Sequence, residues 1–198
     1  DDDIKVIFKT PGIRFDVPAL SKAVQNGAEL TSEMELFFEL CPADIIAVTG
    51  SDGKTTTTSL IYEMLKRGGY NCYLGGNIGS PLIGEVEKIK HNDKVVVELS
   101  SFQLQTMKMS PKIAVVTNVT PNHIDWHTDF DEYISAKKTI FLNQGSDGKV
   151  VLNYDNDITR EFNSETANGI YFSRKNRLNN GYCLNDDMII SFYNDGHI

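Results

Sequence analysis

The sequence predicts an α/β fold in which a mostly parallel sheet is flanked by helices, with a few small edge strands near the C-terminus. Three observations lead to this prediction. The apolar run 45–49 breaks into a glycine-rich turn that is followed by a helical pattern. The runs 94–99 and 112–118 consist almost entirely of Val, Ile and Ala, which is typical of parallel strands buried on both faces. Strand and helix patterns also alternate, as they do in sheets covered by helices.

We expect the first 40 residues to form a connector rather than a domain. They hold a short apolar run at 4–8, the turn residues Pro11 and Gly12, then Pro18 and a mixed helical pattern that ends near Ala28. We therefore place the domain boundary at 40 and assign 41–198 to the central domain.

Within the central domain the expected elements alternate in order. They are a strand at 45–49, a helix from Thr55 to about Lys66, a strand at 71–74, a helix at about 80–90, and strands at 94–99 and 112–118. Gly68 and Gly69 close the first helix, because glycine commonly ends helices. Beyond Gly148, short runs at 150–152, 170–172 and 188–192 are separated by Asn, Asp and Gly, which indicates small edge strands or a hairpin.

Composition limits the classes of protein. A hydrophobic content of 40% in 198 residues is enough for a substantial core. The net charge of −8 disfavours nonspecific binding to nucleic acid. Three cysteines, Cys41, Cys72 and Cys183, lack metal-ligand spacing and predict a reduced, cytoplasmic protein. No membrane span or signal peptide is recognisable. The first residue is not Met, so we expect a piece of a longer protein, and we expect it to be a monomer.

The turn after the run 45–49 has the composition of a phosphate-binding loop. Gly50 and Gly53 lack Cβ atoms, so backbone N–H groups can close around phosphate oxygens. Lys54 adds a positive charge, Thr55 a hydroxyl for Mg²⁺, and the following helix its positive end. The alternative is an ordinary strand-turn-helix corner with an exposed lysine. The candidate phosphate-binding residues are Gly50, Ser51, Asp52, Gly53, Lys54, Thr55 and Thr56.

This loop is shorter than the common P-loop. The pattern G-x-x-x-x-G-K-[ST] would require glycine at position 48, where this chain has Val48. The shorter G-x-x-G-K-T form argues against a generic GTPase or kinase.

Other predicted strands are also followed by residues that could bind a ligand or a metal. Gly75–Gly79 follows the second strand, Glu98 ends the third, and Asn118–Asp125 follows the fourth. A glutamate at a strand end is as often a solvated residue, and Gly-Gly-Asn is usually only a turn. Because ligands bind at the carboxyl ends of parallel strands, their convergence at one edge favours a site, with Glu98 placed to bind Mg²⁺.

Four histidines are candidates for function. His123 and His127 are four apart, so a helix could bring both to one metal, but Pro121 argues against that helix. We favour a functional role for His123. For His127, His91 and His197 we expect a solvated surface position.

The segment Asp129–Gln144 predicts a helix that begins with the capping pair Asp129 and Glu132. Lys137 falls within its apolar stripe, so its amine must reach solvent, pair, or lose its charge, because burial lowers the pKa of an amine. A neutral amine could instead react with CO₂, and the carbamate would be an oxygen ligand for a second Mg²⁺. The apolar stripe comprises Phe130, Tyr133, Ile134, Ile140 and Phe141.

At this point the chain resembles the Mur ligases, the amide ligases of peptidoglycan synthesis. The block Glu98–Leu104 is the most discriminating, and within the family it points to the member that adds D-glutamate to UDP-N-acetylmuramoyl-L-alanine. The resemblance rests on the blocks Pro11–Ile13, Glu33–Phe37, Thr49–Thr56, Gly75–Pro81, Glu98–Leu104, Asn118–Asp125 and Ser135–Ile140, in that order.

The resemblance implies the P-loop-type central ATP-binding domain of such an enzyme, without the N-terminal domain that binds the UDP moiety and the C-terminal domain that binds D-glutamate. It also implies that Lys54 stabilises the transferring γ-phosphoryl group, that Thr55 and Glu98 hold one Mg²⁺, and that His123 and a carbamylated Lys137 serve a second. Asn77, Ser100 and Gln103 would face the muramoyl-alanine substrate.

Two departures from the family pattern stand out. Asp52 replaces the usual Asn of the loop and adds negative charge near the phosphates. Trp126 and His127 stand where the family has a charged residue and an aromatic one, so the resemblance assigns them no role.

The implied reaction is ATP-dependent amide bond formation through an acyl phosphate. The alternatives are another Mur-type or folylpolyglutamate-type amide ligase, or a noncatalytic ATP-binding module. For the 198-residue chain alone we expect weak ATP binding and no ligase activity.

Overall fold

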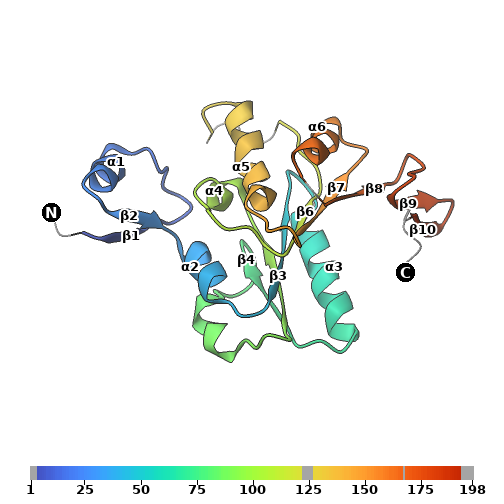
Figure 1. The fold of residues 1–198 in the computed structure, drawn as a ribbon, viewed down its shortest axis with the longest axis horizontal. Coiled ribbons are helices and arrows are strands. Elements are labelled where there is room, and N and C mark those ends of the chain that lie inside the picture. Colours follow the sequence, from blue (N-terminus) through green and yellow to red (C-terminus); the bar gives the residue numbers. More distant parts are fainter. Residues whose placement is uncertain (1–3, 122–126, 167, 193–198) are drawn as a thin grey trace.

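An eight-stranded sheet organises the computed structural model, which describes residues 4–121, 127–166 and 168–192 (Figure 1). Its strand order is β10-β9-β8-β7-β6-β3-β5-β4. Neighbouring strands are parallel except for the pair β9 and β10. The strands are β3 (Asp44–Thr49), β4 (Cys72–Gly76), β5 (Lys94–Glu98), β6 (Ile113–Val116), β7 (Lys149–Asn153), β8 (Gly169–Ser173), β9 (Gly181–Asn185) and β10 (Met188–Phe192).

The predicted parallel sheet is therefore confirmed. Central strand β3 lies between β5 and β6, and residues 95–97 of β5 are fully buried, as expected for a strand covered on both faces. Strand β6 ends at Val116, two residues earlier than expected. The side chains of Thr117 and Asn118 there bond Asp52 of the loop after β3.

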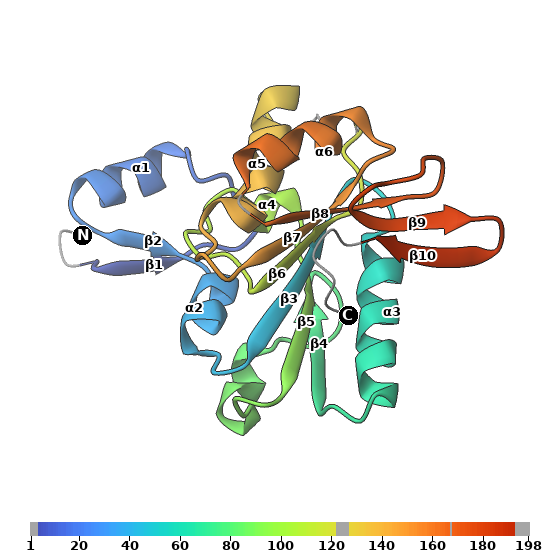
Figure 2. The same ribbon diagram turned by 45° about the vertical axis from the view of Figure 1, so that its right-hand side comes forward.

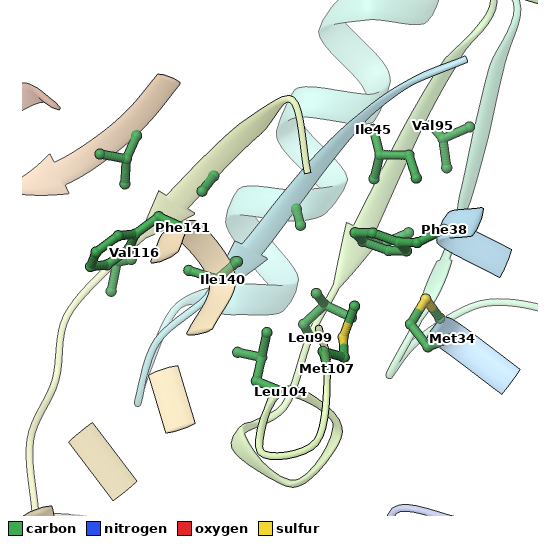
Figure 3. Close-up of a cluster of buried hydrophobic side chains, with 14 of the residues drawn as sticks. Met34, Phe38, Ile45, Val95, Leu99, Leu104, Met107, Val116, Ile140 and Phe141 are labelled. Carbon is green, nitrogen blue, oxygen red and sulfur yellow. The ribbon is translucent and has the colours of Figure 1, made fainter. Parts of the chain in front are cut away.

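The helices cover both faces of the sheet. Helix α3 lies on one side, while α2 and α5 pack on the other (Figure 2). The second side holds the main core, in which Phe38 from α2 and Phe141 from α5 join residues such as Val116 from the strands (Figure 3). The helical elements around the sheet are α2 (Glu33–Leu40), α3 (Lys54–Arg67), η1 (Ile83–Lys88), α4 (Ser101–Leu104), α5 (Phe130–Leu142), α6 (Asp157–Glu161) and η2 (Phe162–Glu165).

Three details of the predicted elements were wrong. The α-helix expected at 80–90 is only the 3₁₀ segment η1, since Pro81 and Gly84 disfavour a regular helix there. Strand β4 continues through Gly75 and Gly76, which were expected to turn. Strands β7 and β8 lie inside the sheet rather than at its edge, and the short helix α6 between them was not foreseen.

Residues 4–40 form a small unit beside the sheet. Strands β1 (Val6–Phe8) and β2 (Glu29–Thr31) pair in parallel, and helix α1 (Pro18–Gln25) connects them (Figure 1). Helix α2 follows after Ser32, whose side chain accepts a hydrogen bond from the Glu35 amide and so caps the helix. The apolar face of α2 enters the main core, which fixes this unit against the sheet.

Within the described ranges, no helix combines the length and the apolar character that crossing a bilayer requires.

Candidate active site

The glycine-rich loop leaves the carboxyl end of β3, where the chain crosses to either side of the sheet. In open α/β sheets this is the usual position of a ligand site. Gly50 has a φ of 151°, and a Cβ on it would lie 1.9 Å from the Thr117 hydroxyl oxygen. The Ser51 amide donates to the Asn118 carbonyl at 2.9 Å, and the Thr117 hydroxyl donates to the Asp52 carbonyl at 2.7 Å. The segment after β6 therefore holds the loop in one conformation.

The beginning of α3 provides donors for an anion. Gly53, with a φ of 77°, precedes the helix and brings no side-chain cap, so the first amides of a 14-residue helix keep their capacity to donate. The Lys54 ammonium folds back over the loop and donates to the Ser51 carbonyl at 2.9 Å. Thr55 and Thr56 are exposed. This arrangement can bind phosphate oxygens.

Glu98 lies at the end of β5, directly beside this loop. Its side chain is 2% exposed, and it accepts hydrogen bonds from the Thr55 hydroxyl at 2.7 Å and from the Asn77 amide at 2.9 Å. Thr55 and Asn77 are themselves exposed. A carboxylate, a hydroxyl and an amide at a phosphate-binding loop are donors that suit Mg²⁺, which takes one or two carboxylates and completes its shell with phosphates and water. The described residues contain no cluster of three or more Asp, Glu, His or Cys side chains that could hold a metal.

Lys137 points from α5 toward the same loop. The inward position predicted from helical periodicity is confirmed, since the residue is 1% exposed and its ammonium donates to the Gly50 carbonyl at 2.8 Å. The amine also lies 4.4 Å from the centre of the Tyr133 ring. The pKa of Lys137 is lowered to about 7, mainly by burial and to a smaller extent by the nearby Lys54 charge, while Asp52 opposes the shift. Lys137 therefore does not reach solvent.

Tyr133 also forms a hydrogen bond that connects helix α5 with the loop. Its hydroxyl lies 2.9 Å from the Ser51 hydroxyl oxygen, which in turn accepts from the Thr120 amide at 2.9 Å. The loop, the segment after β6 and helix α5 thus share one hydrogen-bonded arrangement.

Ser100 and Gln103 have a structural task that the sequence reading missed. They form the capping box of α4, in which the Gln103 amide donates to the Ser100 hydroxyl at 3.3 Å and the Ser100 amide donates to the Gln103 side-chain oxygen at 3.0 Å. The S-x-x-Q spacing was the available signal. Gln103 still faces a cavity, described next, whereas Asn77 lies at Glu98.

A cavity of about 330 Å³ separates residues 4–40 from the sheet. Buried Lys9 lines it, with its ammonium held by the Ile13 carbonyl at 2.9 Å and the Thr10 carbonyl at 3.3 Å, and burial lowers the pKa of this amine. No feature of the sequence had singled out Lys9. The lining comprises residues from three places, namely Phe8, Lys9, Thr10 and Pro11; Ser32, Glu33 and Met34; and Gly76, Gly79, Pro81, Leu82, Phe102, Gln103 and Thr106.

A second cavity of about 540 Å³ opens on the other side of the loop, next to Asp52. The polar groups that line it come from the ends of β6, β7 and β8. The sequence had pointed to the end of β6, through Asn118–Asp125, but not to the ends of β7 and β8. The polar groups belong to Asn118, Thr120, Asn153, Asp155, Asn156, Arg174 and Lys175, with Leu184 beside them.

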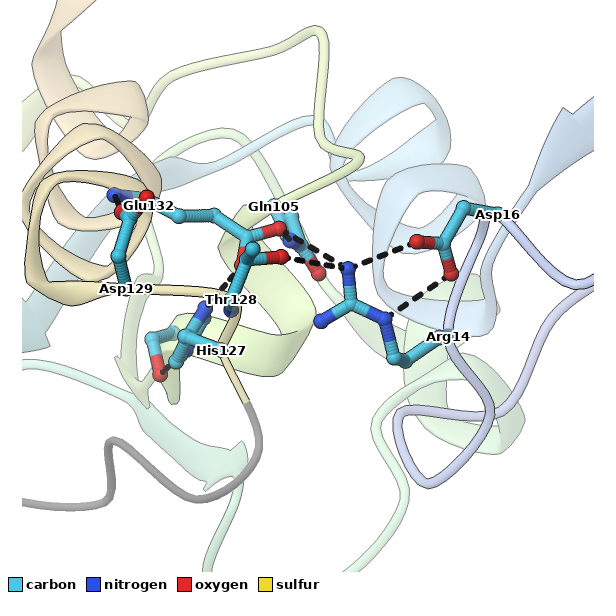
Figure 4. A network of polar contacts seen from close by, with 8 residues as sticks. Arg14, Asp16, Gln105, His127, Thr128, Asp129 and Glu132 are labelled. Carbon is cyan, nitrogen blue, oxygen red and sulfur yellow. Dashed lines mark hydrogen bonds and ion pairs between the residues drawn. The ribbon is translucent and has the colours of Figure 1, made fainter.

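The expectation that His127 is solvated was wrong. Its side chain is buried, stacks on Phe102 at 5.6 Å between ring centroids, and places Nε2 2.9 Å from the Ser101 hydroxyl oxygen. Burial lowers the pKa of the imidazole, although the Glu132 carboxylate opposes this shift. The cause is tertiary, because the start of α5 lies over α4 and encloses the ring (Figure 4).

Of the other three histidines, the structure describes one. His91 is exposed, as expected, with Nδ1 2.8 Å from the Pro42 carbonyl oxygen. His123 and His197 lie outside the described residues.

Comparison with known proteins now identifies the family. Residues 48–192 match the Mur ligase middle domain. The UDP-N-acetylmuramoylalanine–D-glutamate ligase of Acetivibrio thermocellus is 60% identical over 192 residues, which cover 96% of this chain and 41% of the relative. The enzyme of the same name from Ruminiclostridium cellulolyticum is 56% identical over 186 residues, covering 93% of this chain and 40% of the relative.

The chain thus spans about two fifths of the length of these curated relatives. A solved structure, that of a UDP-N-acetylmuramoyl-L-alanyl-D-glutamate–2,6-diaminopimelate ligase, superposes with a TM-score of 0.65 over 92% of this chain and 50% of that one. At 17% identity this likeness shows the fold alone. Together with the domain match, these findings show that the chain belongs to the Mur ligase family.

Proposed function

We propose that this chain is the ATP-binding part of an enzyme that joins D-glutamate to UDP-N-acetylmuramoyl-L-alanine. The observation that carries the proposal is the convergence of Lys54, Thr55, Glu98 and Lys137 at the carboxyl end of β3 in a Mur ligase middle domain. The choice of substrates is supported by two relatives of 60% and 56% identity that bear the name of that ligase.

In this proposal the loop binds the phosphates of ATP. The amides of Gly53 and the start of α3, with the hydroxyls of Thr55 and Thr56, would contact the phosphate oxygens directly. Gly50, Ser51 and Asp52 would shape the loop around the phosphates, because the Ser51 and Asp52 amides already donate to Asn118. Lys54 exchanges its bond to the Ser51 carbonyl for the γ-phosphate, where its charge stabilises the transferring group. Asp52 is exposed, so its carboxylate can point away from the phosphates. The polar cavity beside Asp52 is a suitable place for the nucleoside.

Two Mg²⁺ ions are proposed to complete the site. Thr55 and Glu98 would hold one, and Lys137 and His123 would serve the other, with Lys137 carbamylated. The support for the carbamate is the lowered pKa of about 7, because only the neutral amine adds to CO₂ and loses a proton. When bound, the ions neutralise negative charge shared between ATP and the attacking carboxylate.

The reaction proposed for the whole enzyme has two transfers. The alanine carboxylate attacks the γ-phosphorus and ADP leaves, which forms an acyl phosphate. The amine of D-glutamate then attacks the acyl carbon and phosphate leaves, which forms the amide after loss of a proton. Lys54 stabilises charge in the first transfer, and the chain supplies no nucleophile. Asn77 and Gln103, and Ser100 beside them, are proposed to face the muramoyl-alanine substrate, which would extend into the cavity lined by Lys9 and Gln103.

The test is a coupled assay on the full protein encoded by the gene. With ATP, Mg²⁺, UDP-N-acetylmuramoyl-L-alanine and D-glutamate, we expect ADP, phosphate and the dipeptide product by mass spectrometry. Lys54→Met should abolish the product, whereas Lys88→Met, which changes an exposed lysine far from the loop, should not. Product only with an acceptor that already carries D-glutamate, or with a folate, would identify another amide ligase. ATP binding without any product would favour the noncatalytic module.

We further propose that the protein acts as a monomer in the cytoplasm. Its three cysteines are free thiols, which suits a reducing compartment. Light scattering after size exclusion tests the monomer directly.

A further inference from the structure

The carboxylate of Glu132 joins three segments of the chain at the start of α5. Its Oε1 accepts from the Gln105 side-chain amide at 2.5 Å and from Arg14 Nη2 at 3.2 Å. Its Oε2 accepts from the Thr128 amide and lies 3.7 Å from His127 Nδ1 (Figure 4). A single carboxylate therefore connects the unit formed by residues 4–40 with α4 and α5.

Two of these contacts lead to opposite walls of the 330 Å³ cavity. Arg14 follows the turn in which the Ile13 amide donates to the Thr10 carbonyl at 3.2 Å, and Thr10 lines the first wall. Gln105 directly follows α4, whose Gln103 lines the second wall. The shared oxygen of Glu132 thus bridges the two walls from outside the cavity.

Other contacts orient the two side chains that donate to Glu132 Oε1. The guanidinium of Arg14 also forms a two-pronged pair with Asp16, at 2.9 Å and 2.8 Å, which fixes its plane. The buried Gln105 Oε1 has no hydrogen-bond partner among the described residues, so the described hydrogen bonds of this side chain run through Glu132. The side chains of Arg14 and Glu132 are only 26% and 22% exposed, and such a pair is screened less by salt than a surface pair.

Protonation does not weaken the bridge near neutral pH. Desolvation would raise the pKa of Glu132, but the hydrogen bonds from the Thr128 amide and from Arg14 outweigh it and lower the pKa. The carboxylate therefore stays ionised and keeps both acceptors.

We propose that Arg14 and Glu132 are positioning residues that set the separation of the two walls of this cavity, and so determine the affinity for the UDP-linked substrate rather than for ATP. The inference rests on the proposed function, in which that cavity receives the muramoyl substrate. Neither residue lies at the phosphate loop, whose contacts run through Ser51, Tyr133 and Lys137. None of the hydrogen bonds of Arg14 and Glu132 described above goes to that loop, so we expect breaking the bridge to affect ATP binding less than binding of the UDP-linked substrate.

The experiment measures steady-state kinetics of the full protein with Arg14→Met, Arg14→Lys and Glu132→Gln. For Arg14→Met we expect KM for UDP-N-acetylmuramoyl-L-alanine to rise about 10-fold, as for loss of a partly buried charged pair, while KM for ATP and kcat change less than about twofold. Arg14→Lys should recover part of the affinity, because it retains the charge. The double variant Arg14→Met with Glu132→Gln should cost no more than the worse single variant, since both changes break one bridge.

The matched control is Lys88→Met, which removes the exposed pair with Glu85 and should leave both KM values unchanged. Calorimetric titration with UDP-N-acetylmuramoyl-L-alanine should show the same loss of affinity without turnover. Equal losses for ATP and the UDP-linked substrate, an unchanged KM in Arg14→Met, or additive effects in the double variant would each overturn the proposal. A wild-type protein that makes no product with any acceptor would instead refute the proposed function. If Arg14→Met does not fold, Arg14→Lys and Glu132→Gln still decide the question.

Discussion

The Thr55 hydroxyl donates a 2.7 Å hydrogen bond to the buried carboxylate of Glu98, 43 residues further along the chain. The contact follows from the sheet, because β3 and β5 are neighbours and Val48 stands opposite Glu98. The first residues of α3 consequently start beside the end of β5. The donors proposed for Mg²⁺ are therefore already in contact in the fold itself.

Replacing Glu98 with Gln should weaken nucleotide binding only when Mg²⁺ is present. Gln keeps the size and an acceptor for Thr55 but removes the charge that attracts the cation. We expect the affinity for a nonhydrolysable ATP analogue with Mg²⁺ to fall at least about 10-fold. Calorimetric titration measures this affinity, and Glu85→Gln, which changes a partly buried glutamate paired with Lys88, serves as the control. An equal loss in EDTA would show that Glu98 supports the loop rather than a metal.

Replacing Gly50 or Gly53 of the loop with alanine should lower the free energy of unfolding by very different amounts. At Gly50 the new Cβ would lie 1.9 Å from the Thr117 hydroxyl, so the loop or β6 must move. We expect a loss of about 3 kcal/mol in the free energy of unfolding, the range seen when a close-packed site is overfilled. At Gly53 no atom lies within 4 Å, and only the positive φ is unfavourable, which costs about 1 kcal/mol. Urea unfolding of both variants compares them, and equal losses would contradict this account.

Lys137 should make stability increase with pH. Because its folded pKa is about 7 and the ordinary value is 10.5, the unfolded chain binds one more proton between these limits. The free energy of unfolding therefore rises through this interval, by at most about 1.4 kcal/mol per pH unit. Denaturant unfolding from pH 7 to pH 10 should show this rise in the wild type relative to Lys137→Met. The control Lys138→Met, which removes the partner of Glu165, should retain the wild-type slope.

The carbamate on Lys137 is directly observable. With ¹³C-labelled bicarbonate, we expect a carbamate signal by NMR that Lys137→Met lacks and Lys138→Met retains. Acidification below pH 7 should remove it, because the amine then holds a proton and no longer adds to CO₂. A signal that persists in Lys137→Met would place the carbamate on another amine.

Local patterns in the sequence were enough to predict much of the fold. The apolar runs of β3, β5 and β6 and the helical period of α5 survive in the structure, because burial on a strand or helix follows a short repeat. The same period placed Lys137 inward. The turn between β3 and α3 was also predictable, because glycine, lysine and threonine follow the strand in a fixed order, and its phosphate-binding role stays a prediction.

Such local patterns do not predict contacts between segments that are distant in the sequence. Nothing near His127 indicates that Phe102 and Ser101 enclose it, since those residues arrive through a different crossover of the sheet. The capping of α4 by Ser100 and Gln103 differs from this, because the local S-x-x-Q spacing is enough to predict it.

The sequence by itself determined the α/β class, the glycine-rich loop between β3 and α3 and the inward face of α5, because each depends on neighbours within a few residues. Only the tertiary structure decided that Thr55 meets Glu98, that His127 is buried, and that Arg14 reaches Glu132 across 118 positions. Those contacts depend on the order of strands in the sheet and on how the unit of residues 4–40 docks. The free energy that selects this arrangement comes from burial summed over the whole core and not from any one segment.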